Sequence, residues 1–275
     1  MNDPSHSNLP VGVFDSGVGG LTVLKAIRSE LPFENLIYLG DTARLPYGTK
    51  SPASIARYAV QATAKLQEQG IKLLVVACNT ASAVALDTLR EQMSPLPVIG
   101  VVVPGADAAV SARPHAAHLV LATEATVRLG AYRQAIASRD PRAVVREHAC
   151  EMLVSLAEEG WNDGDIAISI VRRYLEEAAV GGFEAETIIL GCTHFPLLKA
   201  AIRAIVGDDV VIIDSASTTA AAVRESLTNA GALRDSDEPG TTRFLATDGA
   251  TRFARVGSQF LGSKVSADDV ELVDL

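Results

Sequence analysis

The sequence predicts an α/β protein made of two similar doubly wound domains with mainly parallel sheets. Short apolar runs rich in Val and Ile alternate with longer helical patterns, which is typical of parallel strands covered on both faces. Two stretches also share one layout, strand, cysteine, polar residues and helix: LVVACNTASA at 74–83 and TIILGCTHFP at 187–196. We therefore expect two domains related by a pseudo-twofold axis, with a ligand cleft between them outside the carboxyl ends of the strands.

The individual elements follow from the apolar runs and from the residues that separate them. A helix is expected from Ser51 to Gly70, because Ser followed by Pro is a typical helix start and Gly a typical end. Another is expected from Asn162 or Asp163 to the glycine pair at 181–182. We expect strands at 11–14, 35–39, 72–77, 97–102, 118–122, 143–147, 187–190, 210–214 and 242–246.

The domain limits are predicted from the repeat, since no low-complexity linker divides the chain. The two cysteines of the repeat lie about one α/β domain apart. We place the first domain at 1–103 plus 215–275 and the second at 104–214. Residues 229–242 form the most loop-like stretch and are expected to be a surface connection.

Composition excludes several classes of protein. The 275 residues are 48% hydrophobic with a net charge of −9, and the 24 Lys and Arg are spread out, which argues against nucleic acid as the main ligand. Apolar runs are too short to span a membrane, and the first ten residues lack a signal-peptide layout. Three scattered cysteines are too few for a disulfide framework, no Cys/His group has zinc spacing, and no Walker A motif is present. We expect a cytoplasmic protein with no membrane segment and no metal.

Cys78 and Cys192 are the first candidate catalytic residues. A free cysteine is often a small buried hydrophobe, and we assign that structural role to Cys150. The other two each follow a strand and precede a helix, a position that lowers the pKa of a thiol. His194 lies two residues after Cys192 and is expected to do acid–base work beside it.

Two loops at strand ends add further candidates. FDSGVGGLTVLKAI at 14–27 places Asp15 and Ser16 at the end of the first strand, and it is neither a full G-x-G-x-x-G nor a G-x-S-x-G motif. One interpretation is that Asp15 or Ser16 caps the following helix. The other is a functional site, in which the Asp15 carboxylate orients or deprotonates a neighbouring group and the backbone amides of the turn bind an anion. YLGDTARLPYGTKSP at 38–52 is a polar loop of the kind that carries ligand contacts.

Four segments resemble the signature segments of the aspartate/glutamate racemase family, in the family's order: GVFDSGVGGLTV, YLGDTARLPYG, ACNTAS and GCTHFPLL. They span residues 12–198, and the segment FLATDGATRFARVGSQFLG is similar to the family's C-terminal end. Within the family the first two motifs resemble glutamate racemases more than aspartate or hydantoin racemases. Glu151 and Leu129 are departures, at positions where the family commonly has Pro and Ser.

The resemblance implies cofactor-independent interconversion of L- and D-glutamate, with the D-glutamate entering bacterial peptidoglycan. It also implies that Cys78 and Cys192 are the two catalytic cysteines, with Asp15 supporting the first and His194 the second. Racemisation removes the Cα proton from one face and returns a proton to the other, so two acid–base groups across Cα suit it. Which thiol starts ionised is open, because the Asp15 charge raises the pKa of Cys78 and a helix N-terminus lowers it.

Further site residues are carried over from the family's motifs. Glu158, counted back from Gly160, matches a catalytic glutamate, and Glu159 is the alternative. The substrate contacts carry over to Asp15, Ser16, Tyr47, Gly48, Asn79, Thr80, Thr123, Thr126, Thr193 and His194.

Three other functions are left open. One is a racemase for a related acidic amino acid such as aspartate, the second is a hydrolase that uses Cys192 and His194, and the third is a binding protein with a dead site. Some members of the family are reported to affect DNA gyrase, so a secondary gyrase interaction and a homodimer are added to the partner expectations.

Overall fold

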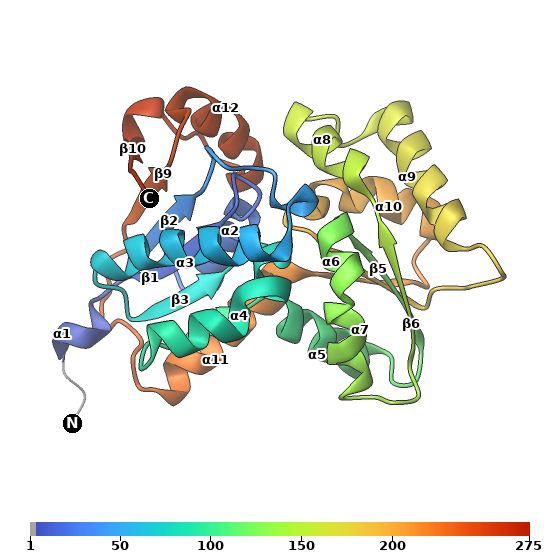
Figure 1. Cartoon of the computed structure of the whole chain (residues 1–275), viewed down its shortest axis with the longest axis horizontal. Coiled ribbons are helices and arrows are strands. Elements are labelled where there is room, and N and C mark those ends of the chain that lie inside the picture. Colours follow the sequence, from blue (N-terminus) through green and yellow to red (C-terminus); the bar gives the residue numbers. More distant parts are fainter. Residues whose placement is uncertain (1–3) are drawn as a thin grey trace.

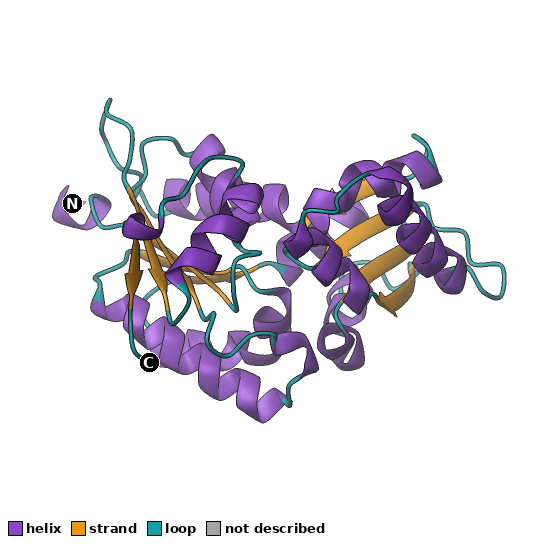
Figure 2. Ribbon diagram, turned by 90° about the horizontal axis from the view of Figure 1, so that it is seen from above, coloured by secondary structure: helices purple, strands orange, loops and turns teal. Residues whose placement is uncertain are grey.

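The structure, a computed structural model, describes residues 4–275; residues 1–3 of the predicted first domain lie outside this range. In the described residues the strands form two parallel sheets, one of six strands and one of four. The two sheets stand apart, each with its own helices around it (Figures 1 and 2). This confirms the predicted α/β fold with two parallel sheets. Within the described range, no helix is long and apolar enough to cross a membrane.

The six-stranded sheet has the order β10-β9-β2-β1-β3-β4 and the four-stranded sheet the order β6-β5-β7-β8. We call the part of the chain around the first sheet the large half and the part around the second sheet the small half. The strands of the large half are β1 (Val11–Asp15), β2 (Leu36–Gly40), β3 (Leu73–Val76), β4 (Val98–Gly100), β9 (Thr242–Ala246) and β10 (Val270–Leu272). Those of the small half are β5 (Ala117–Ala122), β6 (Val144–Ala149), β7 (Thr187–Gly191) and β8 (Val211–Asp214).

The two sheets repeat one topology. The order β2-β1-β3-β4 matches β6-β5-β7-β8 strand for strand, with β9 and β10 added beside β2. In this order the chain leaves β1 and β3 toward opposite edges of the sheet, so a topological switch point lies between them, and another lies between β5 and β7. Ligands of such folds bind at the carboxyl ends of the strands that flank a switch point. The ends of β1, β3, β5 and β7 are therefore where a site is expected.

Helices cover both faces of each sheet. In the large half they are α1 (Pro4–Ser7), α2 (Leu21–Glu30), α3 (Pro52–Glu68), α4 (Asn79–Met93), α11 (Ser215–Asn229) and α12 (Ala250–Leu261). In the small half they are α5 (Val102–Ala112), α6 (Glu124–Leu129), α7 (Ala131–Ala137), α8 (Glu151–Glu159), α9 (Gly164–Ala178) and α10 (Lys199–Val206). Short 3₁₀ turns lie at Tyr47–Thr49, Phe195–Leu198 and Ala267–Asp269.

The core explains why the strands read as continuous apolar runs. Val11 and Val13 of β1 belong to one cluster of buried residues, and Phe14 belongs to the cluster on the opposite face. Successive side chains of a strand point to opposite faces, so a sheet covered on both faces needs apolar residues at every position. The small half has its own pair of clusters on the two faces of its sheet.

All nine predicted strands are present, and the differences lie at element ends. The strand expected over 97–102 ends at Gly100, and Val102 already begins α5. Strand β10 was not predicted, because it is a three-residue edge strand. Ser51 caps α3 as expected, since its side chain accepts a hydrogen bond from the Ser54 amide. Asp163 precedes α9 but makes no side-chain cap bond. The domain limits after 103 and 214 stay a prediction.

Candidate active site

Cys78 and Cys192 line one small cavity between the large and the small half. They follow β3 and β7, the equivalent strands of the two sheets. The cavity volume is about 50 Å³, which is room for a few waters only, because one water occupies about 10–15 Å³ of such volume. This is less room than a small metabolite needs, so the cavity must widen before one can bind. The cavity also brings together these predicted site residues: Ser16, Tyr47, Gly48, Asn79, Thr80, Thr123, Thr193 and His194.

Cys78 is the N-cap residue of α4, and its sulfur has two polar partners. Its Sγ accepts a hydrogen bond from the Ala81 amide at 3.4 Å and donates to Ser16 Oγ at 3.5 Å. Burial, followed by the charge of Asp15, raises the pKa of Cys78 to about 12, while the hydrogen bonds with Ser16 and Ala81 oppose the rise. Burial thus outweighs the helix N-terminus, and Cys78 is a thiol at neutral pH.

Asp15 lies behind the cavity and is fully buried. It does not cap α2, whose N-cap is Gly20; its Oδ2 instead accepts a hydrogen bond from the Gly17 amide at 2.9 Å. The helix-cap interpretation of Asp15 is therefore wrong, and the Gly17 amide is not free for an anion. Burial raises the pKa of Asp15, although the positive charge of His194 and backbone amides lower it. Within the described chain, its Oδ1 atom has no hydrogen-bond partner.

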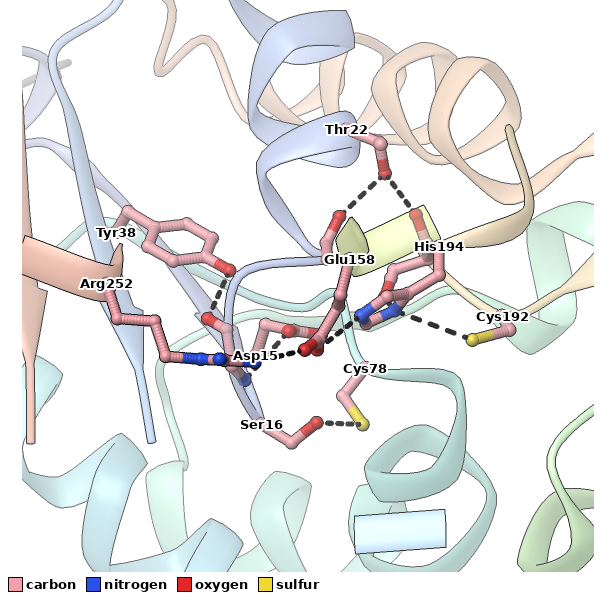
Figure 3. Close-up of polar contacts among 12 residues, drawn as sticks. Asp15, Ser16, Thr22, Tyr38, Cys78, Glu158, Cys192, His194 and Arg252 are labelled. Carbon is pink, nitrogen blue, oxygen red and sulfur yellow. Dashed lines mark hydrogen bonds and ion pairs between the residues drawn. The ribbon is translucent and has the colours of Figure 1, made fainter. Parts of the chain in front are cut away.

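Cys192, His194 and Glu158 form a chain of contacts (Figure 3). The Sγ of Cys192 lies 3.8 Å from His194 Nδ1, and His194 Nε2 lies 3.2 Å from Glu158 Oε1. Burial by itself lowers the pKa of His194, but its hydrogen bonds to Cys192 and Glu158, with their charges, raise it to about 10. At neutral pH an imidazolium therefore lies between a sulfur and a carboxylate. Glu159 is exposed at the end of α8, so Glu158 is the glutamate that reaches this group.

Hydrogen bonds between the halves close the cavity. The Thr80 hydroxyl lies 2.9 Å from that of Thr123 and 3.2 Å from that of Thr126. Tyr132 of α7 donates to Asn79 Oδ1 at 2.7 Å. The Asn79 Nδ2 atom is buried and has no hydrogen-bond partner among the described residues. Thr126 thus sits behind the other threonines, and Asn79 keeps an amide donor at the cavity.

The polar loop after β2 brings Tyr47 and Gly48 to the cavity. Tyr47 donates a hydrogen bond of 2.5 Å to the buried carboxylate of Asp41, and that carboxylate also accepts from the Thr247 hydroxyl after β9, which ties the loop to the large half. A Cβ atom at position 48 would lie 2.9 Å from the Cβ of Thr123. Glycine at this position therefore allows the loop to approach the small half closely.

Sequence reasoning missed several residues that the structure brings to the site, among them Pro46 and Val154 in the cavity lining. Glu151 at the start of α8 lines the cavity, and its Oε1 accepts from the amide of Glu124. Thr22 of α2 donates to the carbonyl of Thr193 across the halves at 3.0 Å. Arg252 of α12 donates to Glu158 Oε2 at 2.7 Å. Only Glu151 gave a signal in the sequence, as a departure from the family's pattern.

The lining chemistry limits what the cavity can hold. No Lys or Arg lines it among the described residues, so a carboxylate there is bound by amide and hydroxyl donors. The described residues contain no group of three or more His, Cys, Asp or Glu side chains placed to hold a metal ion. What the cavity does offer is two sulfur atoms with proton-exchanging neighbours, suited to removing a proton at one place and delivering one at another.

Comparison with known proteins identifies relatives over nearly the whole chain. A sequence model of the Asp/Glu/Hydantoin racemase family matches residues 12–223. A protein of Geobacter metallireducens named glutamate racemase is 46% identical over 265 residues, which cover 96% of each chain. The crystal structure of glutamate racemase from Francisella tularensis in complex with D-glutamate has a TM-score of 0.89 at 36% identity and 98% coverage of both chains. Isoform RacE1 from Bacillus anthracis has a TM-score of 0.92 at 37% identity, covering 98% of this chain and 99% of its own.

Proposed function

The chain belongs to the Asp/Glu/Hydantoin racemase family and is an amino-acid racemase, and from this premise we propose that it interconverts L- and D-glutamate by a two-base mechanism. The choice of glutamate is supported by full-length relatives that are named glutamate racemases and by the D-glutamate in the Francisella structure. The catalytic residues of this proposal are Cys78 and Cys192.

The observation that carries the mechanism is that the two cysteines line one cavity from equivalent positions of a repeated topology. A substrate Cα held between them would have one sulfur on each side. A single base would tend to return the proton to the face from which it came, whereas two bases on opposite faces invert the centre. The repeat of the sheet thus supplies the geometry that racemisation needs.

The proton transfers are written for one direction of the reaction. In this direction Cys78 is the thiol and Cys192 acts as the thiolate beside the His194 imidazolium. The Cys192 thiolate takes the Cα proton, and the electron pair of the broken C–H bond stays on Cα, spread into the α-carboxylate. The Cys78 thiol then donates its proton to the opposite face, which leaves Cys78 as thiolate and Cys192 as thiol. The other enantiomer reacts from that state by the same steps in reverse.

The developing negative charge needs hydrogen-bond donors that are already in place. The buried amide of Asn79 and the hydroxyls of Ser16, Thr80 and Thr193 line the cavity and are the donors that we assign to the substrate's carboxylates. General acid–base catalysis contributes about 10²–10⁴-fold. The rest of the barrier is lowered by these donors and by exclusion of water from the closed cavity.

Asp15, His194 and Glu158 govern the protons of the two sulfurs. Glu158 contacts the Nε2 atom of His194 and so holds the imidazolium with its Nδ1 atom toward Cys192, where it can exchange a proton with that sulfur. Asp15 favours the thiol form of Cys78, since its charge raises the pKa of that sulfur. The charge beside Cys78 is negative and the charge beside Cys192 is positive, so one sulfur gives a proton while the other accepts one.

This mechanism is complete with side chains of the chain itself, so the proposed reaction is cofactor-independent. Through the family resemblance, we extend the proposal to the supply of D-glutamate for peptidoglycan synthesis in the cytoplasm. A homodimer and a secondary gyrase interaction stay predictions.

The test is exchange of the glutamate Cα proton in D₂O, followed by ¹H NMR, together with loss of optical rotation or circular dichroism. We expect both signals with either enantiomer and without added pyridoxal phosphate. Aspartate, assayed in parallel, decides between the two acidic amino acids. Absence of exchange with both glutamate enantiomers would overturn the proposal, and exchange with aspartate alone would move it to aspartate racemisation. An acyl-enzyme trapped with an ester substrate would favour the hydrolase.

A further inference from the structure

We propose that Arg252 is a positioning residue: reaching across from the large half, it holds the carboxylate of Glu158 and thereby sets how tightly His194 keeps its proton beside Cys192. The proposal rests on the proposed function for its kinetic consequence. Its structural part concerns only the contacts of these side chains.

The carboxylate of Glu158 contacts two cationic side chains, Arg252 and His194. Arg252 Nη2 donates to Glu158 Oε2 at 2.7 Å, and His194 Nε2 contacts Glu158 Oε1 at 3.2 Å. Figure 3 shows Arg252, Glu158, His194 and Cys192 in a row, with Glu158 between the two cationic groups. Each oxygen of Glu158 therefore serves one partner, and neither partner can take both without displacing the other.

The contact joins the two halves of the molecule. Arg252 lies in the first turn of α12 in the large half, while Glu158 and His194 belong to α8 and the segment after β7 in the small half. Figure 1 shows α12 and α8 on the same side of the molecule, one on each half. The contact between Arg252 and Glu158 therefore depends on how the two halves sit against each other in this structure.

The charged surroundings indicate which way Arg252 acts. His194 faces Cys192 beside it, Glu158 from α8 and the charge of Asp15 from β1, while Cys78 lies across the cavity. All of these groups are anionic or neutral, so each anion holds the imidazolium proton. Arg252 is a cation next to Glu158 and draws part of the carboxylate's charge away from His194. With Arg252 in place, His194 releases its proton more readily toward Cys192.

The surroundings of Arg252 also limit the size of the effect. Its side chain is 55% exposed, whereas that of Glu158 is 18% exposed. Both border a second cavity of about 130 Å³, to which Asp248 adds a negative charge. A partly exposed ion pair is screened by water and salt. We therefore expect a change in the pKa of His194 of roughly 0.2–0.7 units.

The decisive experiment is the titration of the His194 imidazole by NMR in full-length protein labelled with ¹⁵N-histidine. The signal is assigned by its loss in His194→Asn. Arg252→Gln is expected to raise the pKa of His194, and Glu158→Gln is expected to lower it. Arg252→Lys is expected to restore much of the wild-type value, because it keeps the charge. Arg255→Gln is the matched control on the same helix, since Arg255 is exposed and makes no ion pair among the described residues, and it is expected to change nothing.

Kinetics add a second readout. Arg252→Gln is expected to slow racemisation. The deuterium isotope effect, measured with substrate that carries ²H at Cα, should rise for the enantiomer whose proton Cys192 removes and should fall for the other enantiomer. A merely structural role would affect both enantiomers alike. High salt should move the wild-type enzyme toward the variant.

The outcomes separate the two proposals. An unchanged or lowered pKa of His194 in folded Arg252→Gln, or an equal rise in Arg255→Gln, overturns the role of Arg252 whether or not glutamate is turned over. If the variants titrate as expected and the wild-type protein does not exchange glutamate, the role of Arg252 stands and the proposed function fails. If Arg252→Gln does not fold, Arg252→Met decides by the same titration.

Discussion

The sulfur of Cys192 lies 3.8 Å from the Nδ1 atom of His194, whereas the sulfur of Cys78 has Ser16 and the Ala81 amide, and no histidine of the described residues, as hydrogen-bond partners. The two thiols are equally buried, with 5% and 6% exposure, so access to them is matched. The surroundings of the two thiols differ in charge. A protonated imidazole faces Cys192, while burial and the charge of Asp15 hold Cys78 as a thiol. The site is therefore symmetric in topology and asymmetric in ionisation.

This asymmetry predicts the order of alkylation. At pH 7.5 iodoacetamide is expected to label Cys192 about tenfold or more faster than Cys78, because the thiolate is the reactive form. Peptide mass spectrometry over time measures both rates in one sample. His194→Asn should slow labelling of Cys192 and leave Cys78 unaffected. Faster labelling of Cys78 in the wild-type protein would contradict the assigned ionisation.

Removing one sulfur is expected to separate exchange from inversion. Cys78→Ala and Cys192→Ala should each lower racemisation by about 10²–10⁴-fold or more, because one face loses its acid–base group. Each variant should still exchange the Cα proton of one enantiomer in D₂O without inverting it, and the two variants should act on opposite enantiomers. Cys150→Ala serves as the control, since Cys150 is buried outside the cavity. Near wild-type turnover in either single variant would refute the two-base mechanism.

The hydrogen bond from Tyr132 to Asn79 is expected to matter for both stability and substrate binding. Tyr132→Phe leaves the buried Oδ1 of Asn79 without its donor, at a cost of about 1–3 kcal/mol in free energy of unfolding. It also frees the amide to rotate, so KM for glutamate should rise. Tyr174→Phe is the control, because the Tyr174 hydroxyl accepts from the amide of Met152 and neither of these two residues lines the cavity. Equal effects of the two variants on KM would count against the role of Asn79 in binding.

The sequence predicted the sheets well because strands buried on both faces carry apolar residues at every position. It also placed Cys78 and Cys192 together, since equivalent ends of repeated strands meet at one cleft. It did not predict Arg252, because its contact with Glu158 depends on how the two halves face each other. The sequence also could not decide whether Asp15 caps a helix. The geometry of the loop decides whether the carboxylate accepts from the helix N-terminus or from the Gly17 amide.

The ionisation of His194 predicts how stability varies with pH. Its pKa in the folded protein is about 10, against an unfolded value of 6.5, so its contribution is fully present below pH 6.5 and is lost as the pH rises through 10. The free energy of unfolding should fall over this range by at most about 1.4 kcal/mol per pH unit from this group. Urea unfolding at pH 6 to 10 measures the slope, and His194→Asn should flatten it. An unchanged slope in that variant would mean that another group causes the loss.

Glycine at position 19 is expected to be required by the opposite half of the molecule. A Cβ atom there would overlap the Nδ1 of His194 and the Oγ1 of Thr193, whereas a Cβ at Gly17 would make ordinary contact with Leu45 at 3.5 Å. Gly19→Ala must therefore push the imidazole away from Cys192 or hold the halves apart. Misplacement of a catalytic group by about 1 Å can cost about 10²-fold, so we expect at least that loss in kcat/KM.

The matched variant Gly17→Ala tests whether any added side chain in this loop lowers activity. Neither glycine has a positive φ, so the added methyl group brings no backbone strain at either position, and only the contact with the small half differs. Gly17→Ala is expected to keep kcat/KM within a few-fold of wild type, with both proteins equally folded by circular dichroism. Equal activity in the two alanine variants would show that the large and small halves do not approach each other at Gly19 during turnover.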